Sequence, residues 1–168
     1  KMKSIAYIFG GTSDVGIKLA ISLMEKDCKV INFDVKEPPQ NICKNNKNYS
    51  FKNIDLTFPN QAQDIFEKIL ITNINKFDKT TMIYIARPRP SKGSLKDINF
   101  ESYSESMNIG LNSAVFLTQS FIKYGNSSSS IIYISSLSGT FVSSESIAYQ
   151  LSKSALIHLC KYVSCSFG

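Results

Sequence analysis

The chain has 168 residues, of which 43% are hydrophobic and 19% are charged, proportions typical of a globular protein and not of a disordered one. Its longest apolar runs span only a few residues, whereas a bilayer-spanning helix needs about 20, so no transmembrane helix is expected. No apolar signal-peptide core follows the first residues, and the four cysteines form no Cys-x-x-Cys pair. We therefore expect a cytoplasmic protein with no membrane partner, forming a single domain over residues 1–168.

The basic balance of the chain does not by itself indicate a partner. Nineteen lysines and arginines against 13 acidic residues give a net charge of +6 and a pI near 9.1. The basic residues are scattered and form no stripe interleaved with aromatic residues, so no nucleic-acid partner is expected. The chain has a single histidine, His158, and its cysteines lack zinc-site spacing, so no metal site is expected either.

Hydrophobic patterning predicts strands that alternate with helices along the chain. Short apolar runs predict strands at residues 4–9, 28–35, 49–53, 81–86 and 130–135. Helical periodicity predicts helices at residues 15–26, from about 60, at 100–123 and at 148–164, while residues 36–50 are expected to be mostly loop. The side chains expected on the inner faces of the last two helices include Tyr103, Met107, Leu111, Val115, Ala155, Leu159 and Val163. This order predicts an α/β fold, a doubly wound parallel sheet between two helical layers.

A glycine turn joins the first predicted strand to the first predicted helix. Gly10 and Gly16 flank this turn, and glycine permits both a positive φ and the close approach of a phosphate. The free N–H groups and the positive dipole end of the following helix favour binding of a pyrophosphate. The alternative is a tight turn with no ligand, and the strand before and helix after the turn favour the phosphate interpretation.

Asp34 ends the second predicted strand, 18 residues after Gly16. A carboxylate at this place can accept hydrogen bonds from the adenosine ribose hydroxyls and would repel a 2′-phosphate. The residue therefore favours NAD(H) over NADP(H) as cofactor. The alternative is an aspartate that only terminates a strand or caps a turn.

Three polar residues near the last helix form a candidate catalytic group. Tyr149 and Lys153 are four residues apart, so they share one face of the predicted helix. A free tyrosine is a poor base at neutral pH, but an ammonium within a few ångströms favours the phenolate and makes proton exchange with an alcohol feasible. Ser136 stands 13 residues before Tyr149, at the carboxyl end of a strand, where it could hydrogen-bond the reacting oxygen.

Together these features resemble the short-chain dehydrogenase/reductase family, in its compact single-domain branch, from Ser4 to the end of the chain. The matching motifs are Gly10-Gly11-Thr12-Ser13-Asp14-Val15-Gly16, Asp34, Asp55-Leu56-Thr57, Asn108-Ile109-Gly110, Ile134-Ser135-Ser136-Leu137-Ser138-Gly139 and Tyr149 to Lys153. The resemblance implies a Rossmann-type dinucleotide-binding domain that stops before the last two strands of the family's sheet. It also implies a homodimer or homotetramer, paired through the long helix and the Tyr149 helix.

The resemblance also implies a role for each matched residue. Tyr149 would be the acid/base and Ser136 would bind the reacting oxygen. Lys153 would favour the phenolate and hold the nicotinamide ribose, and Asn108 would hold a water that links Lys153 to solvent. Asp55 would contact the adenine together with the backbone of Leu56. The other implied cofactor-binding residues are Gly10, Thr12, Ser13, Asp14, Val15, Gly16, Asp34, Ala86 and Tyr149 itself.

Two positions depart from the family's pattern. Asp14 replaces the middle glycine of the turn, and its side chain is expected to cap the helix and not to face the phosphates. The family's Asn-Asn-Ala-Gly reads Tyr84-Ile85-Ala86-Arg87 here, so Arg87 places a cation where a glycine lines the cofactor cleft. Arg87 either turns to solvent or anchors an acidic or phosphorylated substrate.

We therefore expect an NAD(H)-dependent oxidoreductase that interconverts a small-molecule secondary alcohol and a ketone by hydride transfer, with Tyr149 as acid/base. Two alternatives stay open. One is a non-catalytic dinucleotide-binding sensor or scaffold of the same fold. The other is an enzyme of sugar or cell-surface polysaccharide metabolism, whose basic cleft would suit an anionic substrate. His158 lies off the face of Lys153 and is interpreted as a packing or surface residue.

Overall fold

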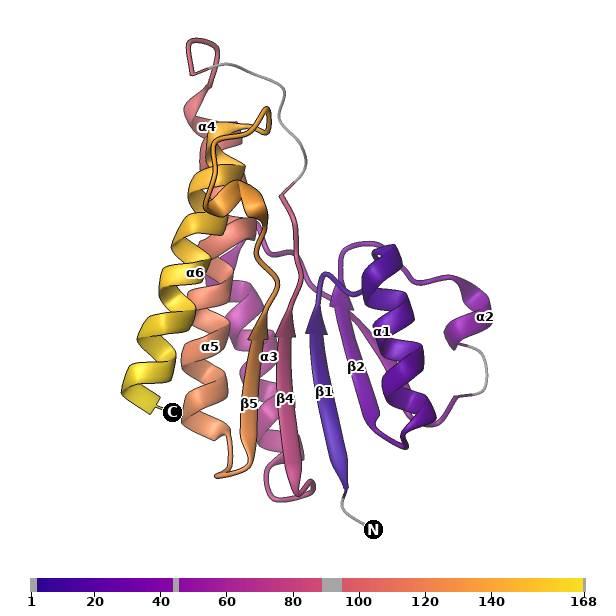
Figure 1. Cartoon of the computed structure of the whole chain (residues 1–168). Coiled ribbons are helices and arrows are strands. Elements are labelled where there is room, and N and C mark those ends of the chain that lie inside the picture. The colour runs from indigo at the N-terminus through magenta and orange to yellow at the C-terminus, as the bar shows by residue number, and fades with distance from the viewer. Residues whose placement is uncertain (1–2, 44–45, 89–94, 168) are drawn as a thin grey trace.

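The structure, a computed structural model, describes residues 3–43, 46–88 and 95–167. In this part of the chain a five-stranded parallel sheet has the strand order β3-β2-β1-β4-β5 (Figure 1). The strands are β1 (Ser4–Phe9), β2 (Lys29–Asp34), β3 (Tyr49–Asn53), β4 (Lys79–Tyr84) and β5 (Ser129–Tyr133). This arrangement confirms the predicted parallel α/β sheet, and each strand begins and ends within about two residues of its predicted range.

Helices cover both faces of this sheet. The helices are α1 (Asp14–Glu25), α2 (Gln40–Cys43), α3 (Pro59–Asn73), α4 (Phe100–Met107), α5 (Ser113–Tyr124) and α6 (Ile147–Phe167). Helix α1 packs against β1 and β2 on one face, while α3, α5 and α6 contribute to the core on the opposite face. Figure 1 shows α1 and α2 apart from the layer that α3, α5 and α6 form. The two hydrophobic clusters therefore lie on opposite sides of β1, whose residues alternate between them.

An aromatic cluster fills the larger of the two cores. It comprises Tyr7, Phe9, Phe33, Phe66 and Phe121, from β1, β2, α3 and α5. The Phe9 and Phe33 rings stack with centroids 4.6 Å apart, and the Phe66 ring meets Phe9 edge-on at 4.9 Å. Edge-on and offset contacts of this kind add to the stabilisation from apolar burial. They fix α3 against the carboxyl halves of β1 and β2.

The direction of the chain connections reverses at β1, the central strand, which places a cleft at the carboxyl ends of the strands. Strand β1 pairs with β2 on one side and with β4 on the other. The chain therefore leaves β1 and β4 in opposite directions, and open α/β sheets bind their ligands at this point, outside the carboxyl ends of the strands. The Gly10 turn follows β1 and the segment from Ile85 to Arg87 follows β4, so both border this position.

The predicted helix at residues 100–123 is interrupted. Residues Asn108–Asn112 form a π-helical turn (η1) between α4 and α5. Val115, expected to face inward, is 38% exposed, whereas Ala114 and Leu117 are buried. The prediction was one position off because the inner face carries small residues such as Ala114 and Ser113, which hydropathy does not mark.

Two smaller differences have local causes. The predicted loop at 36–50 contains the one-turn helix α2, which begins directly after Pro39, a residue suited to helix starts. In α6, Leu156 is fully buried, while Leu159 is only half-buried. Helix α6 contacts η1, α4 and α5 as well as β5, so its buried face is set by several neighbours.

Candidate active site

The turn after β1 has a backbone conformation and a close packing that require glycine at position 10. Gly10 has a φ of +82°, and a Cβ at this position would lie 2.5 Å from the Cα of Ala86. The Gly10 N–H donates to the Phe33 carbonyl at 2.9 Å, which ties the turn to the end of β2. A side chain at position 10 would therefore be strained in backbone and would also clash with the segment after β4.

Ser13, and not Asp14, caps helix α1. The Ser13 hydroxyl oxygen accepts a hydrogen bond from the Gly16 N–H at 3.2 Å, and the hydroxyl donates to the Gly10 carbonyl at 3.1 Å. Asp14 is the first helical residue, and the extended backbone of the cap lies one residue earlier, so the expectation that Asp14 caps the helix was wrong. The Asp14 carboxylate is exposed in the first turn, where the helix dipole favours a negative charge. Val15 is also exposed, on the same turn of the helix.

Asp34 lies at the end of β2 and holds the turn through Thr12. Its Oδ2 accepts hydrogen bonds from the Thr12 hydroxyl at 2.7 Å and from the Thr12 N–H at 3.1 Å. Its Oδ1 accepts from the backbone N–H groups of Val35 and Lys36. The Asp34 carboxylate therefore accepts four hydrogen bonds from the protein, and these connect the end of β2 to the turn after β1.

These residues border a cleft of about 580 Å³ at the carboxyl edge of the sheet. The cleft is lined by Gly10, Thr12, Ser13, Asp34, Val35, Lys36, Ile54, Asp55, Leu56, Thr57, Ile85, Ala86, Arg87, Glu105 and Ile109. Asp55 is exposed and turns its Oδ1 to the hydroxyl and N–H of Thr57, while Leu56 is buried. Seven of the predicted cofactor residues, from four separate strand ends, therefore line one cavity: Gly10, Thr12, Ser13, Asp34, Asp55, Leu56 and Ala86. Asp14, Val15, Gly16, Tyr149 and Lys153 are not among its lining residues.

Tyr149 and Lys153 lie on the same face of α6, as their spacing predicts. The Lys153 ammonium is 5.8 Å from the centroid of the Tyr149 ring, and both residues are buried. The π turn η1 lies close to this helix. A Cβ on Gly110 would lie only 2.4 Å from the Ser152 hydroxyl. Glycine at position 110 therefore lets α6 approach closely enough to present Tyr149 and Lys153 beside the cleft.

The buried ammonium of Lys153 is held by two backbone carbonyls. Its Nζ donates to the Ile134 carbonyl at 3.0 Å and to the Ala86 carbonyl at 3.3 Å. The side chain thus joins the segments after β4 and β5. Burial, and after it the positive charge of Arg87, lower the pKa of Lys153 from 10.5 to about 8. The ammonium is therefore the prevailing form at neutral pH, in a place where a cation is costly.

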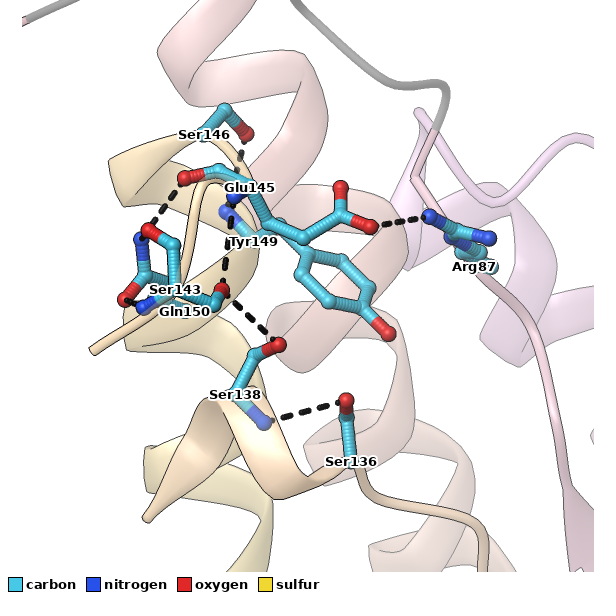
Figure 2. A network of polar contacts seen from close by, with 8 residues as sticks. All are labelled: Arg87, Ser136, Ser138, Ser143, Glu145, Ser146, Tyr149 and Gln150. Atoms are coloured by element: carbon cyan, nitrogen blue, oxygen red, sulfur yellow. Dashed lines mark hydrogen bonds and ion pairs between the residues drawn. The ribbon is translucent and has the colours of Figure 1, made fainter. Parts of the chain in front are cut away.

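Ser136 lies between β5 and the 3-10 turn η2 (Leu137–Gly139). Figure 2 shows its hydroxyl and the Tyr149 phenol directed into the same space, from opposite segments. The Ser136 oxygen accepts a hydrogen bond from the Ser138 N–H at 3.2 Å, which fixes the hydroxyl and leaves its proton free to be donated. The neighbouring Ser135 hydroxyl donates to the Lys153 carbonyl at 2.8 Å and so ties this segment to α6.

Asn108 begins the π turn, and its side chain makes two hydrogen bonds. Its side-chain Nδ2 donates to the Thr57 carbonyl at 3.0 Å, and its Oδ1 accepts from Asn112 at 2.7 Å. The amide therefore links η1 to the loop after β3. The implied water between Asn108 and Lys153 stays a prediction.

The structure adds Glu145 to the site, a residue that the sequence did not indicate. Arg87 forms an ion pair with Glu145, with 2.9 Å between Nη2 and Oε1, and its guanidinium carbon lies 5.0 Å from the centroid of the Tyr149 ring (Figure 2). The unusual cation was visible in the sequence, but Glu145 lies 58 residues away in an irregular segment with no motif. His158 is exposed on α6, and the described residues contain no cluster of three or more metal-ligating side chains.

The model of the short chain dehydrogenase family matches residues 4–167. The chain belongs to the short-chain dehydrogenase family, as the resemblance of its motifs implied. No curated protein matches the sequence. In the described ranges, no helix has the combination of length and hydrophobicity that crossing a membrane requires.

Solved structures of this family share the fold. A short chain dehydrogenase family protein from Francisella tularensis has a TM-score of 0.83 and 24% identity, over 97% of this chain and 63% of its own. A short chain dehydrogenase from Leptospira borgpetersenii with bound NAD+ has a TM-score of 0.81 and 19% identity, over 96% and 65%. A 3-oxoacyl-[acyl-carrier protein] reductase from Brucella melitensis in complex with NAD has a TM-score of 0.81 and 20% identity, over 98% of this chain and 68% of its own. The chain thus spans about two thirds of the length of these relatives.

Proposed function

We propose that this protein is an NAD(H)-dependent oxidoreductase that interconverts a secondary alcohol and a ketone. The observation that carries the proposal is the pairing of the Tyr149 phenol with the buried Lys153 ammonium, beside a cleft that begins at the Gly10 turn. Family membership supports a dehydrogenase, and the Leptospira and Brucella relatives hold NAD+ or NAD in their structures.

The residues of the cleft fit a nicotinamide dinucleotide. Gly10, which has no side chain, borders the cleft, and together with the start of α1 it suits a pyrophosphate. Thr12 and Asp34 line the same cleft and suit the hydroxyls of the adenosine ribose. The Asp34 carboxylate would repel a 2′-phosphate, which favours NAD(H) over NADP(H). Asp55 and the Leu56 backbone border the adenine end, and Lys153 would hold the nicotinamide ribose.

The proton step is assigned to the residues of α6 and β5. When the alcohol is oxidised, the Tyr149 phenolate accepts the hydroxyl proton. A hydride leaves the carbon that bears this hydroxyl, and the C–O bond becomes the C=O bond of the ketone. A bound nicotinamide ring supplies the hydride acceptor in this direction and the hydride donor in the reverse one. Ser136 donates a hydrogen bond to the reacting oxygen, and the Lys153 ammonium stabilises the phenolate.

Replacement of the phenol tests this assignment. In Tyr149→Phe the proton acceptor is removed, so turnover of alcohols and ketones should fall by about 10²–10⁴-fold, the usual contribution of general acid–base catalysis. The Kd for NADH, measured by fluorescence titration, should stay within about twofold, because the ring at position 149 is kept and the residues that line the cleft are unchanged. Tyr162→Phe, on the exposed side of the same helix, is the matched control and should retain full turnover. Wild-type turnover by Tyr149→Phe would contradict the assignment.

A second candidate is a dinucleotide-binding sensor or scaffold without turnover. The Arg87–Glu145 ion pair favours it, because the two side chains lie against the Tyr149 ring where a substrate would approach. A screen of alcohols and ketones with the NADH-saturated protein separates the two candidates. NADH binding with no turnover of any member would support the sensor.

A further inference from the structure

Arg87 places a second cation at the Tyr149 phenol. It follows the buried Ala86 after β4 and lines the same cleft as Gly10 and Asp34. Its guanidinium carbon is 5.0 Å from the Tyr149 ring centroid, closer than the Lys153 Nζ at 5.8 Å. Arg87 is near enough to the Lys153 ammonium to lower the pKa of that residue. The two like charges repel, so an anion beside Arg87 relieves a local cost.

In this structure that anion is the carboxylate of Glu145, an exchangeable partner. The ion pair is open to solvent, with 51% of the Arg87 side chain and 35% of the Glu145 side chain exposed. Exposed ion pairs contribute little to the free energy of unfolding, so separating Arg87 from Glu145 should cost the fold little. Within the described residues, one N–H of the guanidinium fork meets Glu145, whereas the fork is built to bind a carboxylate through two.

The backbone at Glu145 is fixed while its side chain can turn away. The Gln150 Nε2 donates to the Glu145 carbonyl at 2.6 Å and to the Ser143 carbonyl at 3.1 Å. The Gln150 Oε1 accepts from the Ser143 N–H at 3.1 Å, so one side chain of α6 holds the whole segment (Figure 2). None of these three hydrogen bonds involves the Glu145 carboxylate, so the loop is held independently of the ion pair with Arg87.

We propose that Arg87 binds the carboxylate of a short hydroxy acid or keto acid, and that Glu145 occupies this anchor until the substrate displaces it. This inference rests on the proposed function, because the oxygen that reacts is the one that meets Tyr149 and Ser136. Exchange of one carboxylate for another keeps the charge-assisted hydrogen bond to Arg87. A neutral alcohol has no carboxylate to replace that of Glu145, so the Arg87–Glu145 ion pair stays formed beside the Tyr149 ring.

The position of Arg87 limits the length of such a substrate. Figure 2 shows the guanidinium beside the ring and the phenol oxygen at the end of that ring nearer to Ser136. A molecule that reaches both the phenol oxygen and the guanidinium must carry its carboxylate only a few bonds from the reacting carbon. Hydroxyl or keto groups at carbon 2 or carbon 3 of a carboxylic acid meet this limit.

The test compares a charged ligand with its neutral counterpart. Acetoacetate and acetoacetamide share the same carbon skeleton and ketone but differ in charge. Their binding can be measured by calorimetry with the NAD+-saturated protein, in which no hydride is available to reduce the ketone. The wild-type chain should bind acetoacetate about tenfold more tightly than acetoacetamide, and Arg87→Gln should abolish this preference. Glu145→Gln should tighten acetoacetate binding by about threefold, because the competing carboxylate is gone. Lys161→Gln, which removes an exposed cation elsewhere on α6, should keep the wild-type preference.

Four results would overturn the inference. One is equal binding of the two ligands by the wild-type chain, and another is equal weakening of both ligands by Arg87→Gln. The third is unchanged acetoacetate binding in Glu145→Gln, which would show that Glu145 does not compete for the anchor. A weaker NADH affinity in Arg87→Gln, with the ligand preference intact, would instead assign Arg87 to the cofactor and also overturn it.

Failure of the inference is distinguishable from failure of the proposed function. Turnover of neutral ketones that depends on Tyr149, with no preference for the charged ligand, would remove the carboxylate anchor and leave the oxidoreductase. A clear charge preference that depends on Arg87, with turnover unaffected in Tyr149→Phe, would remove the catalytic assignment and leave the anchor.

Discussion

Lys153 is a buried cation of the candidate site, and its burial is expected to lower the free energy of unfolding. The residue is 2% exposed, and its ammonium donates to two backbone carbonyls and not to a carboxylate. Burial of a cation without a counter-charge is costly, and the neighbouring Arg87 adds to the cost. The residue is best explained by its position 5.8 Å from the Tyr149 ring, since a charge at this place can act on the phenol.

This cost predicts a pH dependence of stability. The pKa of Lys153 is about 8 in the folded chain and near 10.5 when unfolded, so the unfolded state binds more protons between these values. The unfolding free energy of the wild-type chain, relative to Lys153→Met, should therefore rise with pH from about 8 to 10.5, by up to about 3 kcal/mol. Urea unfolding at several pH values measures the difference. Lys161→Met, on the exposed side of α6, should show none, and a flat difference for Lys153→Met would contradict the lowered pKa.

At the scale of elements, the contact between η1 and α6 decides whether the site is assembled. Gly110 lies in the π turn and packs on Ser152, which is between Tyr149 and Lys153 in sequence. The turn also leaves the Ile109 carbonyl to accept a hydrogen bond from the Tyr84 hydroxyl at the end of β4. One irregular turn thus connects the strand end, the long helix and the helix that carries the proposed catalytic pair. Irregular π turns are often found at functional sites.

This contact predicts a coupled pair of substitutions. Gly110→Ala would bring a Cβ to 2.4 Å from the Ser152 hydroxyl and should lower the unfolding free energy by about 1–3 kcal/mol. Ser152→Gly removes the opposing atoms, so the double variant should lose less than the sum of the two single variants. Ser154→Gly, at an exposed position of α6, measures the cost of glycine in this helix. Strict additivity in urea unfolding would show that the two residues do not press on each other.

At the scale of the whole molecule, the aromatic cluster joins the sheet to the layer of α3 and α5. Phe66 on α3 is fully buried and contacts rings from β1, β2 and α5, with centroids 4.9 to 6.5 Å away. The same layer holds the loop after β3, because the Ser113 hydroxyl of α5 donates to the Leu56 carbonyl at 2.8 Å. The expected homo-oligomer through the long helix and α6 stays a prediction.

Loss of one ring should therefore destabilise the entire fold. Phe66→Ala should lower the unfolding free energy by about 3–5 kcal/mol, because it removes a large side chain from the centre of the packed cluster. Ile71→Ala on the same helix is the matched control, since Ile71 is 51% exposed and should cost less than about 0.5 kcal/mol. Similar midpoints of urea unfolding for the two variants would contradict the central place of Phe66.

The strands, the Gly10 turn and the Tyr149–Lys153 pair were predictable from the sequence because each depends on local spacing. Alternating apolar runs mark buried strands, and residues four apart share a helix face whatever surrounds the helix. The order of strands and helices was enough to predict the parallel sheet, and the sheet brings Gly10 and Ala86 to one edge.

Tertiary structure alone decided which groups meet at that edge. The Lys153 ammonium binds carbonyls of Ala86 and Ile134, and Arg87 pairs with Glu145, across segments that are far apart in the chain. Such contacts depend on loop conformation and on how closely helices approach, and neither leaves a periodic pattern in the sequence. The helix cap at Ser13 and the π turn at Asn108 were missed for the same reason, since each is fixed by backbone geometry that several residue types could adopt.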